Sequence, residues 1–352
     1  MIAYPPLESE KGIPLLSQNR QFQWFKHHPA YIYPVVPATG ATLLKKDGYN
    51  AIWADGIAEE WSYQEFLSFV EQEKPNLVVM ETKTPVVKKH WKIIDDLKNL
   101  ASGTWPLTTV LVGDHVTALP EESMENSAVD YILTGGDYDF LLLNLCNYLK
   151  ANKNYQLPIT NYQLPRLEPG IWYREDGEAK NTGRFQLDHD LNEAPFIDRD
   201  LTKWELYAYK IGNYKKLPGT YIMAGRDCWW AKCRFCSWVT LYPKYRVRTP
   251  KNVLDEIGML IETYQVREIM DDTGTFPAGA WLEKFCQGMI ERGYHKKVRI
   301  DCNMRPGRLT KKQYQLMGEA GFRMILYGLE SADQEILDRV HKGTKADDIV
   351  KD

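Results

Sequence analysis

The sequence has no excess of basic residues and no long apolar run. Its 44 lysines and arginines face 47 aspartates and glutamates, a net charge of −3. A general nucleic-acid binder is therefore not expected, because no basic surplus is available to neutralise phosphates. No apolar stretch approaches the roughly 20 residues that span a bilayer, and prolines and charges stand where a signal peptide has its apolar core. We expect a soluble, cytoplasmic protein with no nucleic-acid or membrane partner.

The sequence also has too few cysteines, in the wrong places, for a disulfide framework. Three of the six are scattered in or beside apolar stretches, where we expect small buried side chains: Cys146, Cys286 and Cys302. The other three lie within nine residues of one another: Cys228, Cys233 and Cys236. In a reducing cytosol, cysteines spaced this closely indicate a metal or redox site rather than disulfide bridges.

Residues 1–150 alternate between strand-like and helix-like segments. Continuous runs such as LVVM and TVLV are typical of strands buried on both faces of a parallel sheet. Helical patterns between these runs predict β-α-β crossovers and hence an open, doubly wound α/β sheet. The predicted strands are 1–4, 50–55, 75–81, 106–114 and 128–136, and the predicted helices are 35–49, 62–74, 86–100 and 138–150.

Between residues 151 and 217 the periodicity fades. The pentapeptide NYQLP occurs at 154–158 and again at 161–165, and prolines, a glycine and charges follow it. Two copies of five residues are too short for a structural repeat. The sequence therefore predicts an interdomain linker over 151–217.

From residue 218 to 352 four strand–helix units follow one another. They predict the beginning of a (β/α) barrel, a fold whose active groups sit at the carboxyl ends of the strands. The cysteine loop, MDD, CNMRP and GLES all fall at such ends. One helix, 249–264, carries its own start signal, with Thr249 as N-cap and Pro250 in the first position.

The three-cysteine loop allows more than one interpretation. A structural zinc site needs a fourth ligand at a recognisable spacing, and no second C-x-x-C or histidine pair follows. A reactive C-x-x-C dithiol requires a strand–helix context that CRFC lacks. A 4Fe–4S cluster held by three cysteines leaves one iron open to a substrate, and Lys232 and Arg234 would offset the thiolate charge.

The loop after the first barrel strand resembles that of the radical S-adenosylmethionine enzymes. Their usual spacing is C-x3-C-x2-C, whereas this chain reads C-x4-C-x2-C. YRVRTPKNVLDEI with REIMDD, and GLESADQEILDRVHKGT, resemble further elements of the same superfamily. The resemblance implies that the three cysteines ligate iron and that the open iron binds the amino and carboxylate groups of S-adenosylmethionine (SAM). Cleavage of SAM then releases a 5′-deoxyadenosyl radical, with electrons from an external flavodoxin- or ferredoxin-type donor.

The same resemblance implies roles for residues around the loop. Phe235 would pack beside the adenine, Arg305 would pair with a carboxylate, and the remaining contacts to SAM would come from Asp271, Asp272, Glu330 and Ser331. Simpler roles stay open: a loop hydrophobe for Phe235, a solvated rim charge for Arg305, and a helix N-cap for Ser331. Asp271 and Asp272 would then cap backbone N–H groups of their loop.

The first 150 residues resemble the cobalamin-binding domain that precedes the radical domain in one branch of that superfamily. GDHVTALPEE and GGDYDF correspond to two of its loops, and no G-x-G-x-x-G nucleotide motif is present. No D-x-H-x-x-G occurs either, so we expect no histidine on cobalt from that motif and a shape or hydrogen-bonding role for His115. The implied cobalamin contacts are Thr82, Thr84, Gly113, Asp114, His115, Thr117, Gly135, Gly136 and Asp137.

The leading hypothesis is a cobalamin-dependent radical SAM enzyme that transfers a methyl group to an unactivated carbon of a small molecule or peptide. A radical rearrangement or cyclisation with the same cofactors is the first alternative. A non-catalytic module stabilised by zinc or a cluster is the second. Because four strand–helix units fit before Asp352, whereas the family's partial barrel has six, we expect the barrel to be incomplete.

Overall fold

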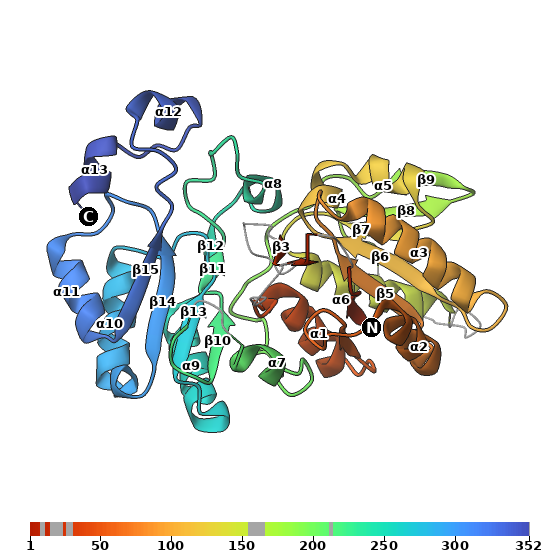
Figure 1. Ribbon diagram of the computed structural model, residues 1–352, viewed down its shortest axis with the longest axis horizontal. Helices are drawn as coiled ribbons and strands as arrows, with labels where there is room; N and C mark the ends of the chain where they lie inside the picture. Colours follow the sequence, from red (N-terminus) through yellow and green to blue (C-terminus); the bar gives the residue numbers. More distant parts are fainter. Residues whose placement is uncertain (8–10, 15–23, 26–30, 154–165, 211–213, 352) are drawn as a thin grey trace. The chain divides into compact units, whose positions relative to one another are not determined.

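The computed structural model describes the chain apart from residues 8–10, 15–23, 26–30, 154–165, 211–213 and 352. Both copies of NYQLP lie outside the described residues. The chain divides into two compact units, each with its own sheet (Figure 1). Unit 1 comprises 1–29, 36–189 and 197–203, and unit 2 comprises 30–35, 190–196 and 204–352.

Unit 1 is built on a seven-stranded sheet in the order β4-β1-β5-β6-β7-β8-β9. The first five of these strands are parallel: β1 (Ile2–Tyr4), β4 (Trp53–Asp55), β5 (Leu77–Glu81), β6 (Thr108–Val112) and β7 (Tyr131–Leu133). In chain order their arrangement is 2-1-3-4-5, the order of a flavodoxin-like doubly wound fold. The predicted α/β architecture of this half of the chain is confirmed.

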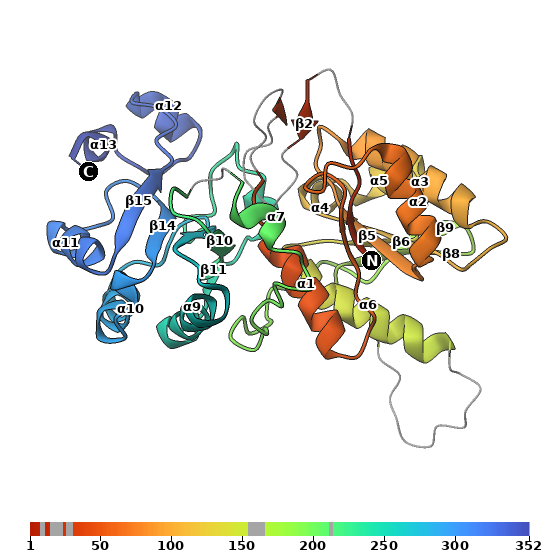
Figure 2. The ribbon, with the colours of Figure 1, turned by 60° about the horizontal axis from the view of Figure 1, so that its bottom comes forward.

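Helices cover both faces of this sheet (Figure 2). On one face lie α1 (Val35–Lys46) and α6 (Tyr138–Lys153), which approach each other closely at Gly40. On the other lie α2 (Tyr63–Glu73), α3 (Val87–Ala101) and α5 (Pro120–Asn126), with the short α4 (Asp114–Ala118) before α5. Helix α2 starts where the sequence dictates, because Ser62 and Glu65 form a capping box.

An antiparallel hairpin extends this sheet at the β7 edge. Strand β8 (Ile171–Glu175) pairs with β7, and β9 (Glu178–Asn181) pairs with β8. The sequence analysis assigned no regular structure to this stretch, which lies within the segment predicted as a linker. Every side chain of β9 is exposed, so the strand lacks the alternation of buried and exposed residues by which sequence patterns reveal strands.

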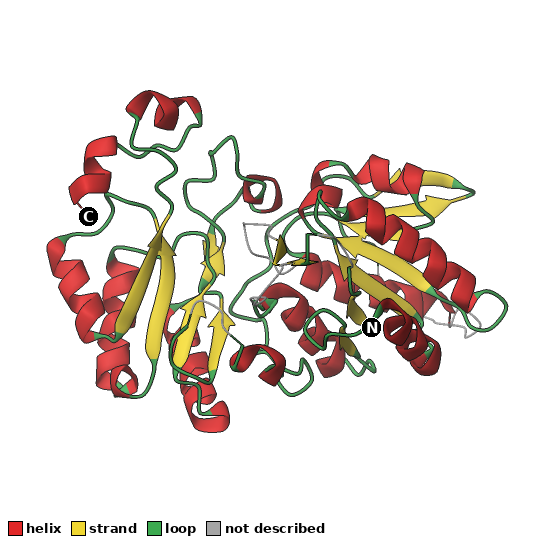
Figure 3. Ribbon diagram, in the orientation of Figure 1, coloured by secondary structure: helices red, strands yellow, loops and turns green. Residues whose placement is uncertain are grey.

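Unit 2 contains a four-stranded parallel sheet in the order β10-β13-β14-β15. Helices α9, α10 and α11 alternate with the strands and lie along one side of the sheet (Figures 2 and 3). This succession is the predicted start of a (β/α) barrel. Its elements are β10 (Gly219–Ile222), α9 (Pro250–Tyr264), β13 (Glu268–Asp271), α10 (Ala280–Glu291), β14 (Arg299–Met304), α11 (Lys311–Glu319), β15 (Phe322–Tyr327) and α12 (Gln334–Arg339).

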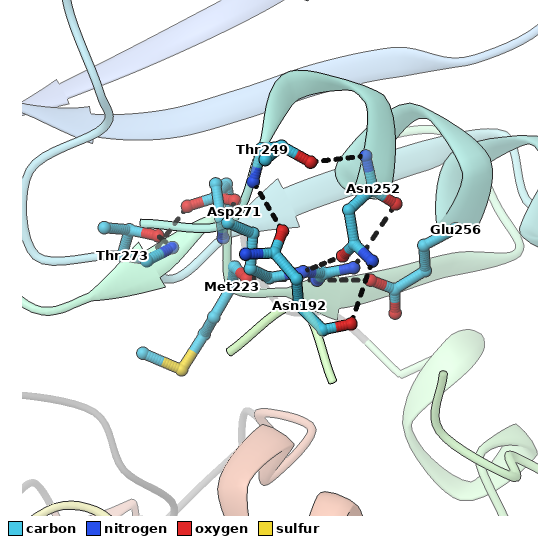
Figure 4. Close-up of polar contacts among 10 residues, drawn as sticks. Asn192, Met223, Thr249, Asn252, Glu256, Asp271 and Thr273 are labelled. Carbon is cyan, nitrogen blue, oxygen red and sulfur yellow. Dashed lines mark hydrogen bonds and ion pairs between the residues drawn. The ribbon is translucent and has the colours of Figure 1, made fainter. Parts of the chain in front are cut away.

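The start of α9 is locked to the end of β10 (Figure 4). Thr249 caps the helix by accepting the Asn252 N–H, as predicted, and its own N–H donates to Asn192 Oδ1 at 2.7 Å. Arg248 donates to Glu256 at 2.6 Å and to the Met223 carbonyl at 3.2 Å. These contacts fix the strand just before the cysteine loop.

Short elements complete the described chain. They are β2 (Ile13–Pro14), β3 (Trp24–Phe25), α7 (Glu205–Ala208), β11 (Gly225–Arg226), α8 (Trp238–Leu241), β12 (Arg246–Val247), the 3₁₀ turn η1 (Tyr294–Lys296) and α13 (Ala346–Lys351). None of the helices in the described part of the chain has the length and apolarity to cross a membrane.

Candidate functional site

The cysteine loop leaves the carboxyl end of the first strand of unit 2. Cys228, Cys233 and Cys236 are half-buried thiols, and none of the three forms a disulfide. Cys228 Sγ lies 3.2 Å from the Thr275 hydroxyl, and the Cys236 N–H donates to the Cys233 carbonyl at 3.3 Å. The loop is therefore a compact turn that carries three partly accessible sulfur atoms.

The loop that follows β13 holds the cysteine loop from one side. The Thr275 N–H donates to the Asp227 carbonyl at 3.2 Å, and the Gly274 N–H donates to the Asp227 carboxylate. The Gly225 N–H donates to the Thr273 hydroxyl at 2.9 Å. Asp227, the residue before the first cysteine, is thus fixed by N–H groups of the loop that follows β13.

Asp271 ends β13, as predicted, and its side chain is fully buried. Its two carboxylate oxygens accept N–H groups from Ala224 at 2.8 Å and from Thr273 at 2.9 Å. Burial raises the pKa of this carboxyl to about 6, although these hydrogen bonds oppose the rise. The next residue, Asp272, is 8% exposed. Asp271 therefore braces the start of the cysteine loop; the predicted contacts of both aspartates with SAM stay predictions.

Arg305 lies next to the cysteine loop just after β14. It is buried, its Nη1 lies 3.9 Å from Cys233 Sγ, and its Nη2 donates to Thr344 Oγ1 at 3.2 Å. Burial raises the pKa of the Cys233 thiol, and the positive charges of Lys342 and Arg305 oppose that rise. Arg305 is thus not a solvated rim charge, one of the two roles that the sequence left open.

The loop after β15 brings two more predicted residues to the same end of the sheet. Glu330 pairs with Lys342 at 2.8 Å and adopts a left-handed backbone, with φ of 66°. Ser331 Oγ accepts the Asp333 N–H at 3.0 Å, whereas Asp333 is the N-cap of α12. Phe235 is 52% exposed, and the Lys342 ammonium lies 5.8 Å from its ring centre. The predicted roles of Phe235, Glu330 and Ser331 toward SAM stay predictions.

Unit 1 gathers a second set of predicted residues at the carboxyl edge of its sheet. Thr84 and His115 lie 3.1 Å apart through Oγ1 and Nδ1, and the Thr117 hydroxyl accepts the Gly135 N–H at 3.0 Å. Gly113 has φ of 116°, and a Cβ there would lie 2.4 Å from the Thr82 carbonyl. Only glycine fits such a backbone and such a close approach.

Three buried polar atoms at this edge have no hydrogen-bond partner in the described part of the chain: His90 Nε2, Asp114 Oδ1 and His115 Nε2. His115 Nε2 does lie 3.2 Å from Glu122 Oε2, close enough for attraction but outside hydrogen-bond geometry. Burial lowers the pKa of His90 to about 3, so its ring is neutral, and its Nδ1 pairs with Thr82 Oγ1 at 2.8 Å. Buried polar atoms without a hydrogen-bond partner, next to loops in which glycine allows close approach, are typical of a site for a large polar ligand.

A small cavity lies between the sheet and helices α1 and α6, beside β1 and β5, where the strand order reverses. Tyr4 and Glu81 line it from the strands and Tyr138 from α6. The Tyr4 hydroxyl donates to Glu81 at 2.7 Å, and burial raises the pKa of that carboxyl to about 7.

His189 supports the last loop of this edge. Its ring nitrogens lie 3.2 Å from Asp137 and 3.1 Å from Glu168, and the ring stacks on Phe140 with centres 4.4 Å apart. Burial lowers the pKa of His189, but the two carboxylates outweigh burial and raise it to about 9. His189 is therefore a cation at neutral pH that fixes Asp137. Gly136, the last of the predicted cobalamin contacts, directly precedes Asp137 and also interacts with another part of the described chain.

Comparison with known proteins supports the interpretation of unit 2 that the cysteine loop suggests. Residues 222–351 match the model of the Radical SAM superfamily, so the chain carries a radical SAM domain. Such a domain implies a 4Fe–4S cluster and SAM, and the resemblance stated from the cysteine loop is confirmed for this domain.

Two curated relatives cover most of this chain. An uncharacterized methyltransferase of Pyrococcus horikoshii is 22% identical over 322 residues, 88% of this chain and 65% of that protein. The anaerobic magnesium-protoporphyrin IX monomethyl ester cyclase of Cereibacter sphaeroides is 26% identical over 310 residues, 86% of this chain and 47% of that protein. The chain thus spans about half to two thirds of the lengths of these relatives.

Two solved structures share the fold. The cobalamin-dependent SAM radical enzyme OxsB, with aqua-cobalamin and SAM bound, aligns with a TM-score of 0.71 at 18% identity, over 91% of this chain and 44% of its own. The radical SAM methyltransferase TsrM of Kitasatospora setae, with cobalamin and a 4Fe–4S cluster bound, aligns with a TM-score of 0.67 at 16% identity, over 98% and 64%. These alignments confirm the predicted fold class.

The donor set of the cysteine loop fits an iron–sulfur cluster. Among the described residues, no three His, Cys, Asp or Glu side chains are grouped closely enough to hold a single metal ion. The loop instead offers three thiols outside any disulfide on one turn, beside the buried cation of Arg305. Thiolate ligands, a nearby positive charge and partial burial suit a cluster with one open iron.

Several residues of the site escaped sequence reasoning. Asp227 accepts a hydrogen bond from the Gly274 N–H, and the Thr275 hydroxyl lies against Cys228. Lys342, which follows α12, pairs with Glu330. Glu81 ends β5 directly before Thr82, and a carboxylate at a strand end is a signal that the sequence offers. His189 lies more than 50 residues from Asp137, and no local pattern marks it.

Proposed function

We propose that this chain is part of a radical SAM enzyme in which Cys228, Cys233 and Cys236 hold a 4Fe–4S cluster. Three thiols at a strand end with Arg305 beside Cys233 are the observation that carries the proposal, together with the radical SAM domain over 222–351. The cluster and SAM, when bound, supply a 5′-deoxyadenosyl radical.

The residues of the chain bind and orient these groups. The three cysteine sulfurs ligate iron. The Ala224 N–H donates to Asp271, and the Gly274 N–H donates to Asp227, so the backbone just before the first cysteine is held against the end of β13 and the loop that follows it. Arg305 offsets the negative charge of the thiolates from a buried position. We place Phe235, Asp272, Glu330 and Ser331 around SAM. The electrons come from an external donor of the flavodoxin or ferredoxin type.

We propose further that unit 1 binds cobalamin and that the reaction transfers a methyl group to an unactivated carbon of a small molecule or peptide. The glycine-built loops and the unsatisfied buried polar atoms at its sheet edge support this proposal. It is also supported by the two cobalamin-bound neighbours of the same fold and by the relative named a methyltransferase. Cobalamin, when bound, supplies the methyl group.

The second candidate is a radical cyclisation or rearrangement with the same cofactors. The relatives named anaerobic magnesium-protoporphyrin IX monomethyl ester cyclase favour it, at 26% identity over 310 residues. The two candidates share both cofactor sites and differ in the product.

Anaerobic reconstitution with iron and sulfide tests the first proposal. We expect about four irons per chain and an absorption shoulder near about 400 nm. Incubation with SAM and a reductant should release methionine and 5′-deoxyadenosine. One tightly bound zinc and no cleavage would overturn the proposal in favour of a non-catalytic module.

Cobalamin binding is tested separately, by titrating hydroxocobalamin into the chain and following its visible spectrum. Retention of cobalamin through gel filtration supports the assignment of unit 1, and its complete loss contradicts it. Labelled methyl-SAM with cell extract then separates the two candidates: a labelled product indicates methyl transfer, and an unlabelled cyclised product indicates cyclisation.

A further inference from the structure

The first spacer of the cysteine loop has four residues, one more than the usual spacing of the radical SAM enzymes, and it forms a turn. Its four residues are Trp229, Trp230, Ala231 and Lys232. Ala231 has φ of 45°, a left-handed backbone that non-glycine residues seldom adopt. The two indole rings stand nearly perpendicular, with centres 6.0 Å apart. The turn directs both rings toward residues from other parts of unit 2.

Cations from the loop after β14 meet these rings. The Arg305 guanidinium lies 5.1 Å from the ring centre of Trp230 and 5.4 Å from that of Trp229. Arg308 lies 4.7 Å from the Trp229 ring centre. Cation–π contacts of this kind favour a fixed side-chain position when the cation is desolvated, as it is for the buried Arg305.

The tryptophan turn also contacts residues 339–344, a segment that begins with the last residue of α12. The last carbonyl groups of a helix have no partner within the helix. Here four successive carbonyls accept hydrogen bonds from the cysteine loop or from Arg305. The pairs are Arg339 O with Arg234 Nη1 at 3.3 Å, Val340 O with Arg234 N at 3.0 Å, His341 O with Trp230 Nε1 at 2.7 Å, and Lys342 O with Arg305 Nη2.

Gly343 makes this contact sterically possible. It has φ of 64°, and a Cβ there would lie 2.1 Å from the Trp230 ring. The ring therefore packs directly on the glycine backbone, which no other residue type allows. Arg305 also donates to the Thr344 hydroxyl at 3.2 Å. The 339–344 segment is thus fixed on both sides of Lys342.

The contacts of residues 339–344 with the cysteine loop and Arg305 fix the position of Lys342, which carries a buried charge. It is 6% exposed, its ammonium lies 2.8 Å from Glu330 Oε1, and it stands 5.8 Å from the Phe235 ring centre. Glu330 has a left-handed backbone and a side chain that is 36% exposed, and the ion pair with Lys342 gives its carboxylate a defined position.

We propose that Trp230 and Arg305 fasten the 339–344 segment to the cysteine loop, and that Lys342 is a positioning residue that holds Glu330 beside Phe235 for the binding of SAM. The role of Lys342 rests on the function proposed above. The fastening of the segment does not, because it concerns contacts within the chain itself.

The fastening is tested by alkylation of the full chain without a cluster. Iodoacetamide labelling of each cysteine is followed by mass spectrometry. Trp230→Phe keeps the packing but removes the N–H, so Cys233 should react about fivefold faster, the factor for one lost hydrogen bond. Trp105→Phe is the matched control, because Trp105 Nε1 also donates to a carbonyl, that of Pro75 at 3.1 Å, and both residues belong to unit 1.

Gly343→Ala should accelerate the labelling of Cys233 more than Trp230→Phe does. Continued protection of the fully buried Cys286 shows that each variant is folded. Unchanged reactivity of Cys233 in both folded variants would overturn the fastening. Equal acceleration in Trp105→Phe would overturn it as well, because the effect would then not belong to this contact.

The role of Lys342 is tested by SAM binding to the reconstituted chain. By equilibrium dialysis, Lys342→Gln should weaken SAM affinity about tenfold, as expected for a lost hydrogen bond to a charged group, with iron content unchanged. Lys342→Arg should restore most of the affinity, and the exposed Lys345→Gln should match the wild type. Wild-type affinity in Lys342→Gln overturns the positioning role. Failure of the wild type to bind a cluster or SAM overturns the proposed function and leaves the alkylation result standing.

Discussion

The charged histidine of unit 1 makes a pH-dependent contribution to folding that can be measured. His189 sits between the carboxylates of Asp137 and Glu168, which raise its pKa to about 9 from an ordinary value of 6.5. A group whose pKa is raised in the folded state stabilises that state fully below its unfolded pKa. The contribution is therefore complete below pH 6.5 and is lost as the pH rises through about 9.

The size of this contribution follows from the pKa and the exposure of the groups. The rise to about 9 corresponds to about 3.4 kcal/mol in the absence of solvent screening. The side chains of His189 and Glu168 are 21% and 38% exposed, so water screens part of the attraction. We expect His189→Gln to destabilise the loop around Asp137 by about 1–2 kcal/mol at pH 6.

Hydrogen exchange measures this effect better than global unfolding, because a chain of two compact units need not unfold in one step. Exchange rates of peptides around Asp137 are compared between variant and wild type at each pH, which cancels the intrinsic rate. His189→Gln should exchange about 5- to 30-fold faster at pH 6 and at the wild-type rate near pH 10. Glu168→Gln, which keeps Asp137, should show a smaller ratio. A ratio for His189→Gln that is the same at pH 6 and pH 10 would refute the reasoning.

Three further predictions concern single positions. Cys233→Ser should retain less than half of the wild-type iron after reconstitution, by iron assay, whereas Cys146→Ser should retain all of it. Because burial raises the pKa of Glu81 to about 7, its ionisation costs stability as the pH rises from 4.5 to 7. Glu81→Gln should therefore gain about 1–3 kcal/mol over the wild type in urea unfolding at pH 8 and little at pH 4.5; equal gains at both would contradict this. Gly113→Ala should cost about 2–4 kcal/mol, because it combines a left-handed backbone with a steric clash. Gly103→Ala, with φ of 69° and open space around it, should cost about 1 kcal/mol by thermal unfolding.

Much of the fold was predictable because its signals are local. Continuous apolar runs marked β5 and β6, and the Thr249–Pro250 pair marked the start of α9. The β8–β9 hairpin was not predictable from such patterns, because it is stabilised by pairing with β7 rather than by burial of one face. Helix α12 ends at Arg339, His341 has a left-handed backbone with φ of 54°, and the His341 carbonyl bonds to Trp230 of the cysteine loop, a contact that no local sequence pattern marks.

The amino-acid sequence alone indicated the kind of chemistry: three thiols at the end of a strand, in a context that resembles the radical SAM enzymes. Residue type and spacing carry that information, because ligand chemistry depends on which atoms are present. The tertiary structure decided which groups surround those thiols. Asp271 turned out to hold backbone N–H groups, and Arg305 turned out to be buried beside Cys233. Trp230 and Lys342 are 112 residues apart in the chain, and only folding brings the tryptophan turn onto the backbone around Lys342.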